Sequence, residues 1–143
     1  MEAVLLDTTV ASLLHPKKKG STLRALYEPE MKGKTLVLSF QSVAELWGWA
    51  VENRWGLKQR RGLEVFLRRF VVVPYDFGLA KVWAEITAHC KKRGRRLEAG
   101  DAWIIATAAY RKIPLLTHDR DHLGLGINGL IAVSHVVSAT GDQ

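Results

Sequence analysis

The chain has 143 residues, of which 48% are hydrophobic and 24% charged, and 21 Lys and Arg against 14 Asp and Glu give a formal net charge of +7. This composition excludes a mainly disordered or fibrous chain, and the length predicts a single domain over residues 1–143. No apolar run approaches the roughly 20 residues of a membrane span, and the N-terminus lacks the features of a signal peptide, so we expect a soluble, cytoplasmic protein.

Short apolar runs alternate along the chain with longer segments in which apolar residues recur at intervals of three and four. The runs are typical of buried parallel strands, and the longer segments are typical of helices that bury one face. In chain order we predict a strand at residues 3–6, helical turns at 8–15, a helix at 22–27, a strand at 35–38, helices at 42–53 and 57–70, a strand at 71–73, helices at 76–94 and 101–111, and strands at 115–116 and 130–133. This alternation predicts an α/β fold of three layers, α/β/α, with helices on both faces of a mostly parallel sheet of about four or five short strands.

Two of these boundaries depend on particular residues. Ser42, with Glu45 three residues later, has the pattern of a capping box, which predicts that a helix begins at Ser42. Pro29 predicts that the helix at residues 22–27 ends before it, because proline interrupts helical hydrogen bonding.

Acidic residues recur next to the ends of the predicted strands. Asp7, Asp119 and Asp121 follow strands directly, Asp101 begins a helix, and Glu45 lies one turn into the helix after the second strand. Ligands of open α/β sheets bind outside the carboxyl ends of the strands, so we expect these carboxylates to meet at one rim. Clustered carboxylates need a cation between them, and oxygen ligands favour Mg²⁺ or Mn²⁺. Such an ion can activate water to hydrolyse a phosphodiester.

Each acid also has a structural interpretation. Asp7 and Asp101 could be helix N-caps, Glu45 could belong only to the capping box, and Asp119 and Asp121 could be ordinary turn residues. Independent caps have no reason to gather at one edge of a sheet. The joint pattern therefore favours a metal site.

The positive charge is concentrated in blocks. The densest block contains Lys91, Lys92, Arg93, Arg95 and Arg96. Such blocks favour nucleic acid, because Lys and Arg release the counterions of phosphates, although a solvated helix face has the same composition. We expect this block to bind the substrate.

Four segments resemble, in order, the four motifs of the PIN domain, and more narrowly those of VapC-type toxins of type II toxin–antitoxin systems. They are residues 5–10 (LLDTTV), 42–46 (SVAEL), 100–108 (GDAWIIATA) and 116–123 (LTHDRDHL). The resemblance covers nearly the whole chain. It implies a Mg²⁺- or Mn²⁺-dependent endoribonuclease, usually a homodimer, that a cognate VapB-like antitoxin holds inactive.

By position in these motifs, the resemblance implies four acids that are both catalytic and metal-binding, namely Asp7, Glu45, Asp101 and Asp119. Asp121 is a second candidate for the fourth ligand, because the family varies between these two positions. Thr8 and Thr117 match hydroxyl positions that support the first and last carboxylates. The sequence departs from the family at Thr9, where Asn or Ser is frequent, and at His122, which together with the leucine after it replaces a common aromatic.

The tryptophans and two loop histidines allow more than one interpretation. Trp47, Trp49 and Trp55 could stack on bases, but they lie near the helical hairpin that in VapC-like proteins helps to form the antitoxin-binding surface, so we expect partner contact. His118 and His122 flank the acidic turn and could move protons. A histidine exposed in a loop without a catalytic role is the more common case.

Two other functions fit parts of the pattern. A haloacid-dehalogenase-type phosphatase also has an Asp after its first strand, but it needs a second Asp two residues later, where this chain has Thr9. A binding module of the same fold without catalysis would be expected to have lost at least one of the four acids. A metal-dependent endoribonuclease is therefore the favoured prediction.

Overall fold

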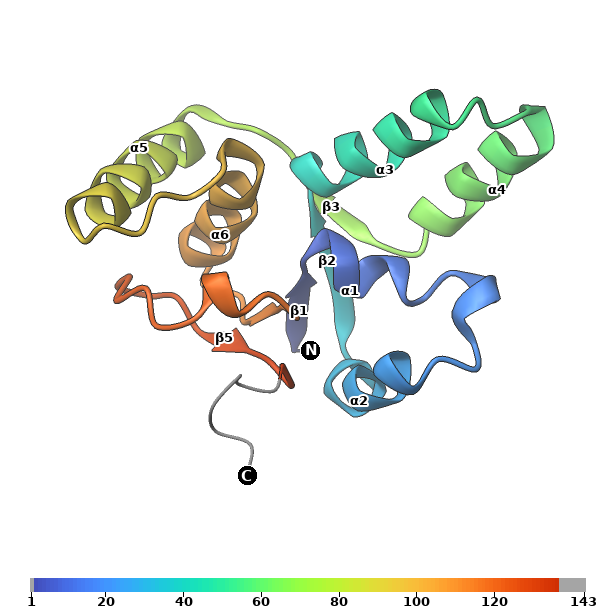
Figure 1. Cartoon of the computed structure of the whole chain (residues 1–143), viewed down its shortest axis with the longest axis horizontal. Helices are drawn as coiled ribbons and strands as arrows, with labels where there is room; N and C mark the ends of the chain where they lie inside the picture. The colour runs from blue at the N-terminus through green and yellow to red at the C-terminus, as the bar shows by residue number, and fades with distance from the viewer. Residues whose placement is uncertain (1, 137–143) are drawn as a thin grey trace.

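The structure is a computed structural model that describes residues 2–136, and its centre is a parallel sheet with strand order β3-β2-β1-β4-β5 (Figure 1). The strands are β1 (Ala3–Leu6), β2 (Thr35–Ser39), β3 (Val71–Val73), β4 (Leu115–Leu116) and β5 (Ala132–Val133). Each neighbouring pair is parallel. The predicted sheet is thereby confirmed, and β1 lies at its centre, so the residue after β1 lies in the middle of the rim.

Helices cover both faces of the sheet, as predicted (Figure 1). The helical segments are α1 (Thr8–Ser12), the 3₁₀ turn η1 (Pro16–Lys18), α2 (Thr22–Met31), α3 (Phe40–Glu52), α4 (Leu57–Leu67), α5 (Phe77–Lys92), α6 (Ala99–Arg111) and the 3₁₀ turn η2 (Arg120–His122). Val4 and Leu6 pack under α1 to α4, while Leu5 packs under α5 and α6. Burial on both faces explains why β1 is apolar at every position.

The helix after β2 begins earlier than the sequence predicts. Ser39 is the N-cap of α3, and its Oγ accepts a hydrogen bond from the backbone N of Gln41 at 3.1 Å. The predicted capping box of Ser42 and Glu45 is therefore wrong. The last strand residue turns directly into the helix without a loop, and Ser42 lies inside α3, fully buried.

Two other segments have bounds different from the predicted ones. Helix α2 continues through Pro29 to Met31. Pro29 lies in the last turn, where the loss of one hydrogen bond costs little, and the buried side chains of Tyr27 and Met31 fix this turn against the core. The strand predicted at residues 130–133 is reduced to β5. None of the helices in the part of the chain that the structure describes is long and apolar enough to cross a membrane.

Candidate metal site

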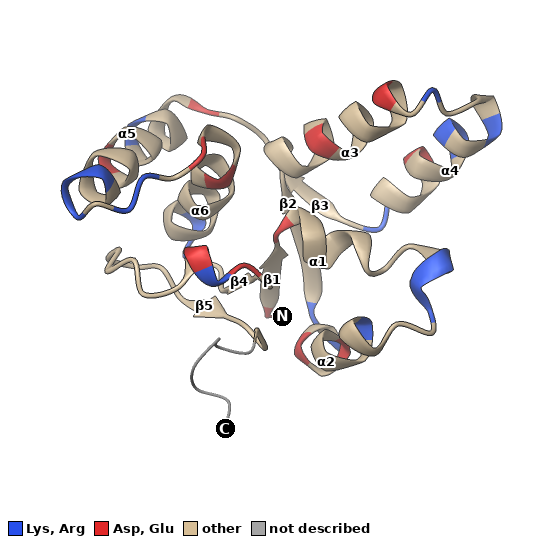
Figure 2. Cartoon of the chain, viewed as in Figure 1, with Lys and Arg blue, Asp and Glu red and all other residues tan. Residues whose placement is uncertain are grey.

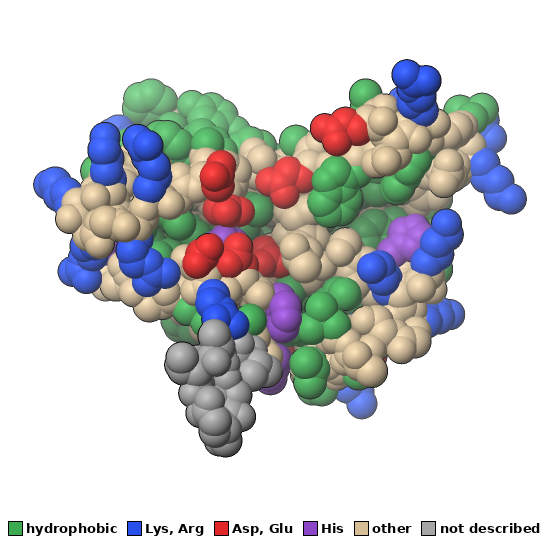
Figure 3. Space-filling view, viewed as in Figure 1, with side chains coloured by type: hydrophobic (Ala, Val, Ile, Leu, Met, Phe, Trp, Pro, Cys, Tyr) green, Lys and Arg blue, Asp and Glu red, His purple; other side chains and the backbone are tan. Residues whose placement is uncertain are grey.

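Acidic residues cluster at one place in the fold. Some Asp and Glu gather near the ends of β1 and β4 and the start of α6, while others lie on α2 to α5, and Lys and Arg lie mostly toward the outer ends of the molecule (Figure 2). In the space-filling view, acidic side chains meet at the middle of one face, with basic side chains on both sides of them (Figure 3). The rim of the sheet is therefore the acidic centre of a basic protein.

Asp7 follows β1 directly and is only 4% exposed. Its Oδ1 accepts a hydrogen bond from the backbone N of Val10 at 2.8 Å and caps α1, and its Oδ2 accepts one from the hydroxyl of Thr117. Burial raises the pKa of the Asp7 carboxyl above its ordinary value, although these hydrogen bonds and the nearby His122 oppose the rise. Asp7 is thus both a helix cap and a buried carboxyl group at the rim.

Thr117 joins the acid after β1 to the acid after β4. It is fully buried, and its Oγ1 also accepts a hydrogen bond from the backbone N of Asp119 at 3.1 Å. The same oxygen lies 3.1 Å from Nδ1 of His122. One hydroxyl therefore positions Asp7, Asp119 and His122 together. The resemblance implied this support for Thr117.

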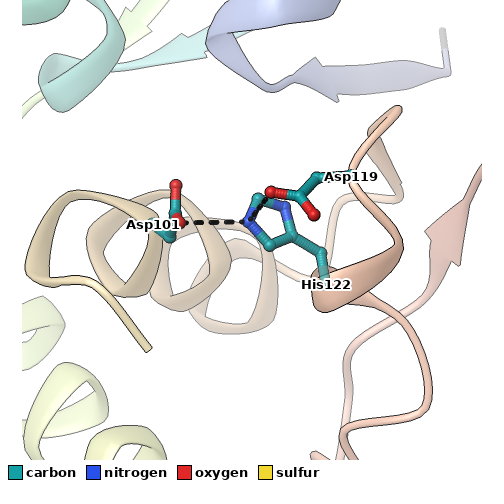
Figure 4. Close-up of side chains that lie close together, drawn as sticks. All are labelled: Asp101, Asp119 and His122. Atoms are coloured by element: carbon teal, nitrogen blue, oxygen red, sulfur yellow. Dashed lines mark ion pairs between the residues drawn. The ribbon is translucent and has the colours of Figure 1, made fainter. Parts of the chain in front are cut away.

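His122 lies among the carboxylates rather than in solvent, so its interpretation as an exposed loop residue is wrong. The residue is 3% exposed, and its Nε2 lies 3.5 Å from Oδ2 of Asp101 and 3.5 Å from Oδ2 of Asp119 (Figure 4). Burial alone lowers the pKa of His122, but the facing carboxylates of Asp101, Asp119 and Asp7 outweigh burial and raise it.

Asp101 and Asp119 reach the site from different elements. Asp101 lies in the first turn of α6, whose N-cap is Glu98, so the interpretation of Asp101 as an N-cap is wrong. Asp119 precedes η2 and accepts a hydrogen bond from the backbone N of Asp121 at 2.9 Å. One ligand atom each from Asp101, Asp119 and His122 lie within 4.8 Å of one another, a spacing at which the three residues could hold a metal ion.

Three of the predicted acids, Asp7, Glu45 and Asp121, lie outside this group of three. Oε2 of Glu45 accepts a hydrogen bond from Nε2 of Gln41, one turn earlier on α3, at 2.8 Å. Glu45 nevertheless faces the start of α6, because a Cβ placed on Gly100 would lie 3.0 Å from its Oε2. The side chain of Asp121 is exposed. Of the two candidates for the fourth ligand, the geometry therefore brings Asp119, and not Asp121, to the group.

Thr8 has a different partner from Thr117. Its hydroxyl donates a hydrogen bond to Oγ of Ser42 at 2.9 Å, and both residues are buried. This bond connects α1 to α3, the helix that carries Glu45. The contribution of Thr8 to the site is therefore to fix the distance between two elements of the rim.

Comparison with known proteins identifies the family. Residues 4–126 match the PIN domain family. This chain belongs to the PIN domain family. Over 53 residues, the PIN domain is 40% identical to Ribonuclease VapC5 of Mycobacterium tuberculosis (strain ATCC 25618 / H37Rv), a match that covers 37% of this chain and only 39% of that relative.

Solved structures share the fold over nearly the whole length. VapBC-5 from Mycobacterium tuberculosis matches with a TM-score of 0.68 and 25% identity, covering 94% of this chain and 99% of that one. VapBC2 from Rickettsia felis, bound to a DNA fragment from its promoter, matches with a TM-score of 0.77 and 18% identity, covering 92% and 98%. VapBC-1 from nontypeable Haemophilus influenzae matches with a TM-score of 0.74 and 24% identity, covering 92% and 97%.

The basic block of the PIN domain divides into two parts. Arg95 is partly buried, and its guanidinium donates to the backbone oxygens of Gly124 and Asp121, both at 3.1 Å, so it holds two loops together. The exposed members are Lys91, Lys92, Arg93 and Arg96. The predicted contact with a polyanion therefore depends on these four residues.

The three tryptophans of the hairpin formed by α3 and α4 differ in their surroundings. Trp49 and Trp55 line an apolar groove of about 470 Å³ between this hairpin and the segment around η1. Trp49 is 42% exposed there. Trp47 does not line this groove; like Trp55, it is partly buried and packed against the core. Trp49 and Trp55, rather than Trp47, have the surroundings of a partner contact.

Proposed function

We propose that this PIN domain is a metal-dependent endoribonuclease and the toxin of a type II toxin–antitoxin system. The observation that carries the proposal is the approach of Asp101 to Asp119 at the rim, with Asp7 joined to Asp119 through the hydroxyl of Thr117. The similarity to Ribonuclease VapC5 supports RNA as the substrate. RNA cleavage would place the protein in the cytoplasm.

The donor groups at the rim fit Mg²⁺ or Mn²⁺. Asp101 and Asp119 face each other across His122, and a divalent ion among them would offset the repulsion of the two carboxylates. Asp7 offers a further oxygen from the strand end, and Glu45 offers one from α3. Hard cations of this kind bind to carboxylate oxygens and keep several waters.

The ion and the side chains of the rim would have different roles in cleavage. When bound, the ion supplies a Lewis acid that lowers the pKa of a coordinated water and stabilises the leaving oxygen of the phosphodiester. Asp7, Asp101 and Asp119 would hold it, with Thr117 fixing the orientation of Asp7. Glu45 faces the same rim and would accept a proton from the attacking water. The exposed cations at residues 91–96 would hold RNA phosphates beside the rim.

We propose a VapB-like antitoxin as the partner, consistent with the VapBC complexes that share this fold. The apolar groove at Trp49 and Trp55 is the surface that it would contact, and Trp47 would support this surface from within. Its aromatic lining is typical of protein interfaces. A homodimer is a further part of this proposal.

The test is an RNA cleavage assay on purified protein freed of antitoxin. We expect cleavage of unstructured or structured RNA in Mg²⁺ or Mn²⁺, no cleavage in EDTA, and loss of cleavage in Asp101→Asn. Asp121→Asn is the matched variant, since its exposed side chain lies outside the group formed by Asp101, Asp119 and His122. Cleavage that persists in EDTA or in Asp101→Asn would refute the proposal, and loss in Asp121→Asn would reassign the fourth ligand.

A further inference from the structure

The hydroxyl of Thr117 determines which nitrogen of His122 carries the proton in the neutral ring. Thr117 has one O–H, and it donates this proton to Asp7, whose carboxylate can only accept. In its two remaining hydrogen bonds, Oγ1 must therefore be the acceptor. The donors are the backbone N of Asp119 and Nδ1 of His122. With the proton on Nδ1, neutral His122 carries its lone pair on Nε2.

That lone pair faces the carboxylates. Nε2 of His122 is buried and has no hydrogen-bond partner among the described residues. It lies 3.5 Å from one oxygen each of Asp101 and Asp119, and Figure 4 shows all three groups converging on the space between them. Ligand atoms bound to one ion at about 2.1 Å lie about 3 to 4 Å apart, so only a small contraction of this group is needed.

We propose that His122 is a nitrogen ligand of the divalent ion and makes the site select Mn²⁺ over Mg²⁺. This inference rests on the proposed metal site. Carboxylates bind both ions, whereas imidazole suits transition metals better than it suits Mg²⁺. Thr117 supplies the second shell that a ligating histidine needs, because it receives the other ring N–H and fixes the tautomer. The oxygen ligands come from the motifs of the family, and the nitrogen comes from the position where this chain departs from them.

The same contacts have an opposite interpretation, in which a protonated His122 replaces the ion as a counter-charge between Asp101 and Asp119. A ligand strengthens metal binding, whereas a competing cation weakens it. The two roles therefore differ in the sign of the effect that His122→Phe has on the affinity for Mn²⁺. Phenylalanine retains a ring at this buried position and offers no lone pair.

The experiment is titration calorimetry of the antitoxin-free protein with Mn²⁺ and with Mg²⁺ at about pH 8, because high pH favours the neutral ring that can bind a metal ion. We expect His122→Phe to lose about tenfold or more in Mn²⁺ affinity, the range that loss of even a second-shell partner costs, and much less in Mg²⁺ affinity. The matched control is His89→Phe, because His89 is partly buried and contacts the backbone oxygen of Leu125 instead of the acids.

A spectroscopic measurement on the unmodified protein does not depend on the folding of a variant. Electron spin echo spectra of bound Mn²⁺ should show modulation from a directly coordinated nitrogen. Absence of this modulation, unchanged or increased Mn²⁺ affinity in His122→Phe, or equal losses for both ions would overturn the nitrogen ligand while leaving the oxygen site intact. Failure of the unmodified protein to bind either ion would overturn the metal site itself.

Discussion

Replacing Thr117 with valine tests whether one buried hydroxyl holds the acidic rim together. Valine has nearly the shape of threonine, so the substitution removes the hydroxyl from a fully buried position without opening a large cavity. Asp7 then loses a donor to its buried carboxylate, and the backbone N of Asp119 and Nδ1 of His122 lose their acceptor.

The size of the effect follows from these three lost contacts. A hydrogen bond to a charged group contributes about 1.5–3 kcal/mol, and each buried group left unpaired costs about 1–3 kcal/mol. Some of the unpaired groups will relax toward water at the rim. We therefore expect Thr117→Val to lower the free energy of unfolding of the metal-free protein by about 2–4 kcal/mol near neutral pH.

The loss of stability caused by Thr117→Val should also depend on pH. Because the pKa of Asp7 is raised above 3.8 in the fold, the stability contributed by its protonated form is present below 3.8 and is lost as pH rises through the folded-state pKa. The hydrogen bond from Thr117 lowers this pKa, so valine raises it further. The difference in stability between Thr117→Val and the unmodified protein should therefore grow as pH increases from about 4 to 8.

The assay is urea unfolding in EDTA at several pH values, with Thr107→Val as the matched control. Thr107 is also fully buried, but its hydroxyl donates to the backbone oxygen of Trp103, which lies within the same helix, and lies 3.3 Å from Oγ of Ser39. Its loss should cost only about 1 kcal/mol. The reasoning is refuted if Thr117→Val is no more destabilising than Thr107→Val, or if its effect is the same at every pH.

Three further predictions concern Asp7, the basic block, and His15, whose Nδ1 accepts a hydrogen bond from the backbone N of Lys17 at the start of η1. Asp7→Asn should reduce the pH dependence of the stability of the EDTA-treated protein between about pH 4 and 8 in urea unfolding, because it removes a carboxyl group whose pKa burial raises; an unchanged pH dependence contradicts this. Burial and two neighbouring lysines lower the pKa of His15, so its contribution to stability is present above 6.5 and is lost as pH falls through the folded-state pKa. As pH falls below 6.5, the urea unfolding midpoint of the unmodified protein should therefore decrease more than that of His15→Asn. Equal decreases would count against a lowered pKa of His15. Replacing Lys91, Lys92 and Arg93 with glutamine should weaken RNA binding and reduce the salt slope by about 2, at about 0.7 per phosphate contact, whereas the same change at residues 17–19 should not; filter binding at several salt concentrations measures both, and an unchanged slope would make the block a solvated face.

The sequence predicts the fold well because its signals are local. The apolar runs at β1 and β2 and the helical spacing in α5 each report burial of their own segment, and the alternation of strands and helices then specifies the parallel sheet. The start of α3 was mispredicted because Ser39 and Ser42 both suit an N-cap, and only the direct turn from β2 into the helix decides between them.

The site was predictable only in part, because it depends on contacts between distant segments. Asp7, Asp101 and Asp119 could be predicted, since strand ends and helix starts share a rim. The burial of His122 could not, because it results from the packing of η2 against residues far away in the chain, including Asp101. The pairing of Glu45 with Gln41 likewise appears only once α3 has its observed start.

The most direct test of hydrolysis at this rim is the chemistry of the RNA ends after a single turnover in water labelled with heavy oxygen. Attack by an activated water predicts a linear phosphate end that carries one labelled oxygen, formed in Mg²⁺ or Mn²⁺ and absent in EDTA. A cyclic phosphate end without the label would show attack by the neighbouring 2′-hydroxyl instead and would contradict the account, as would labelled ends that form equally well in EDTA.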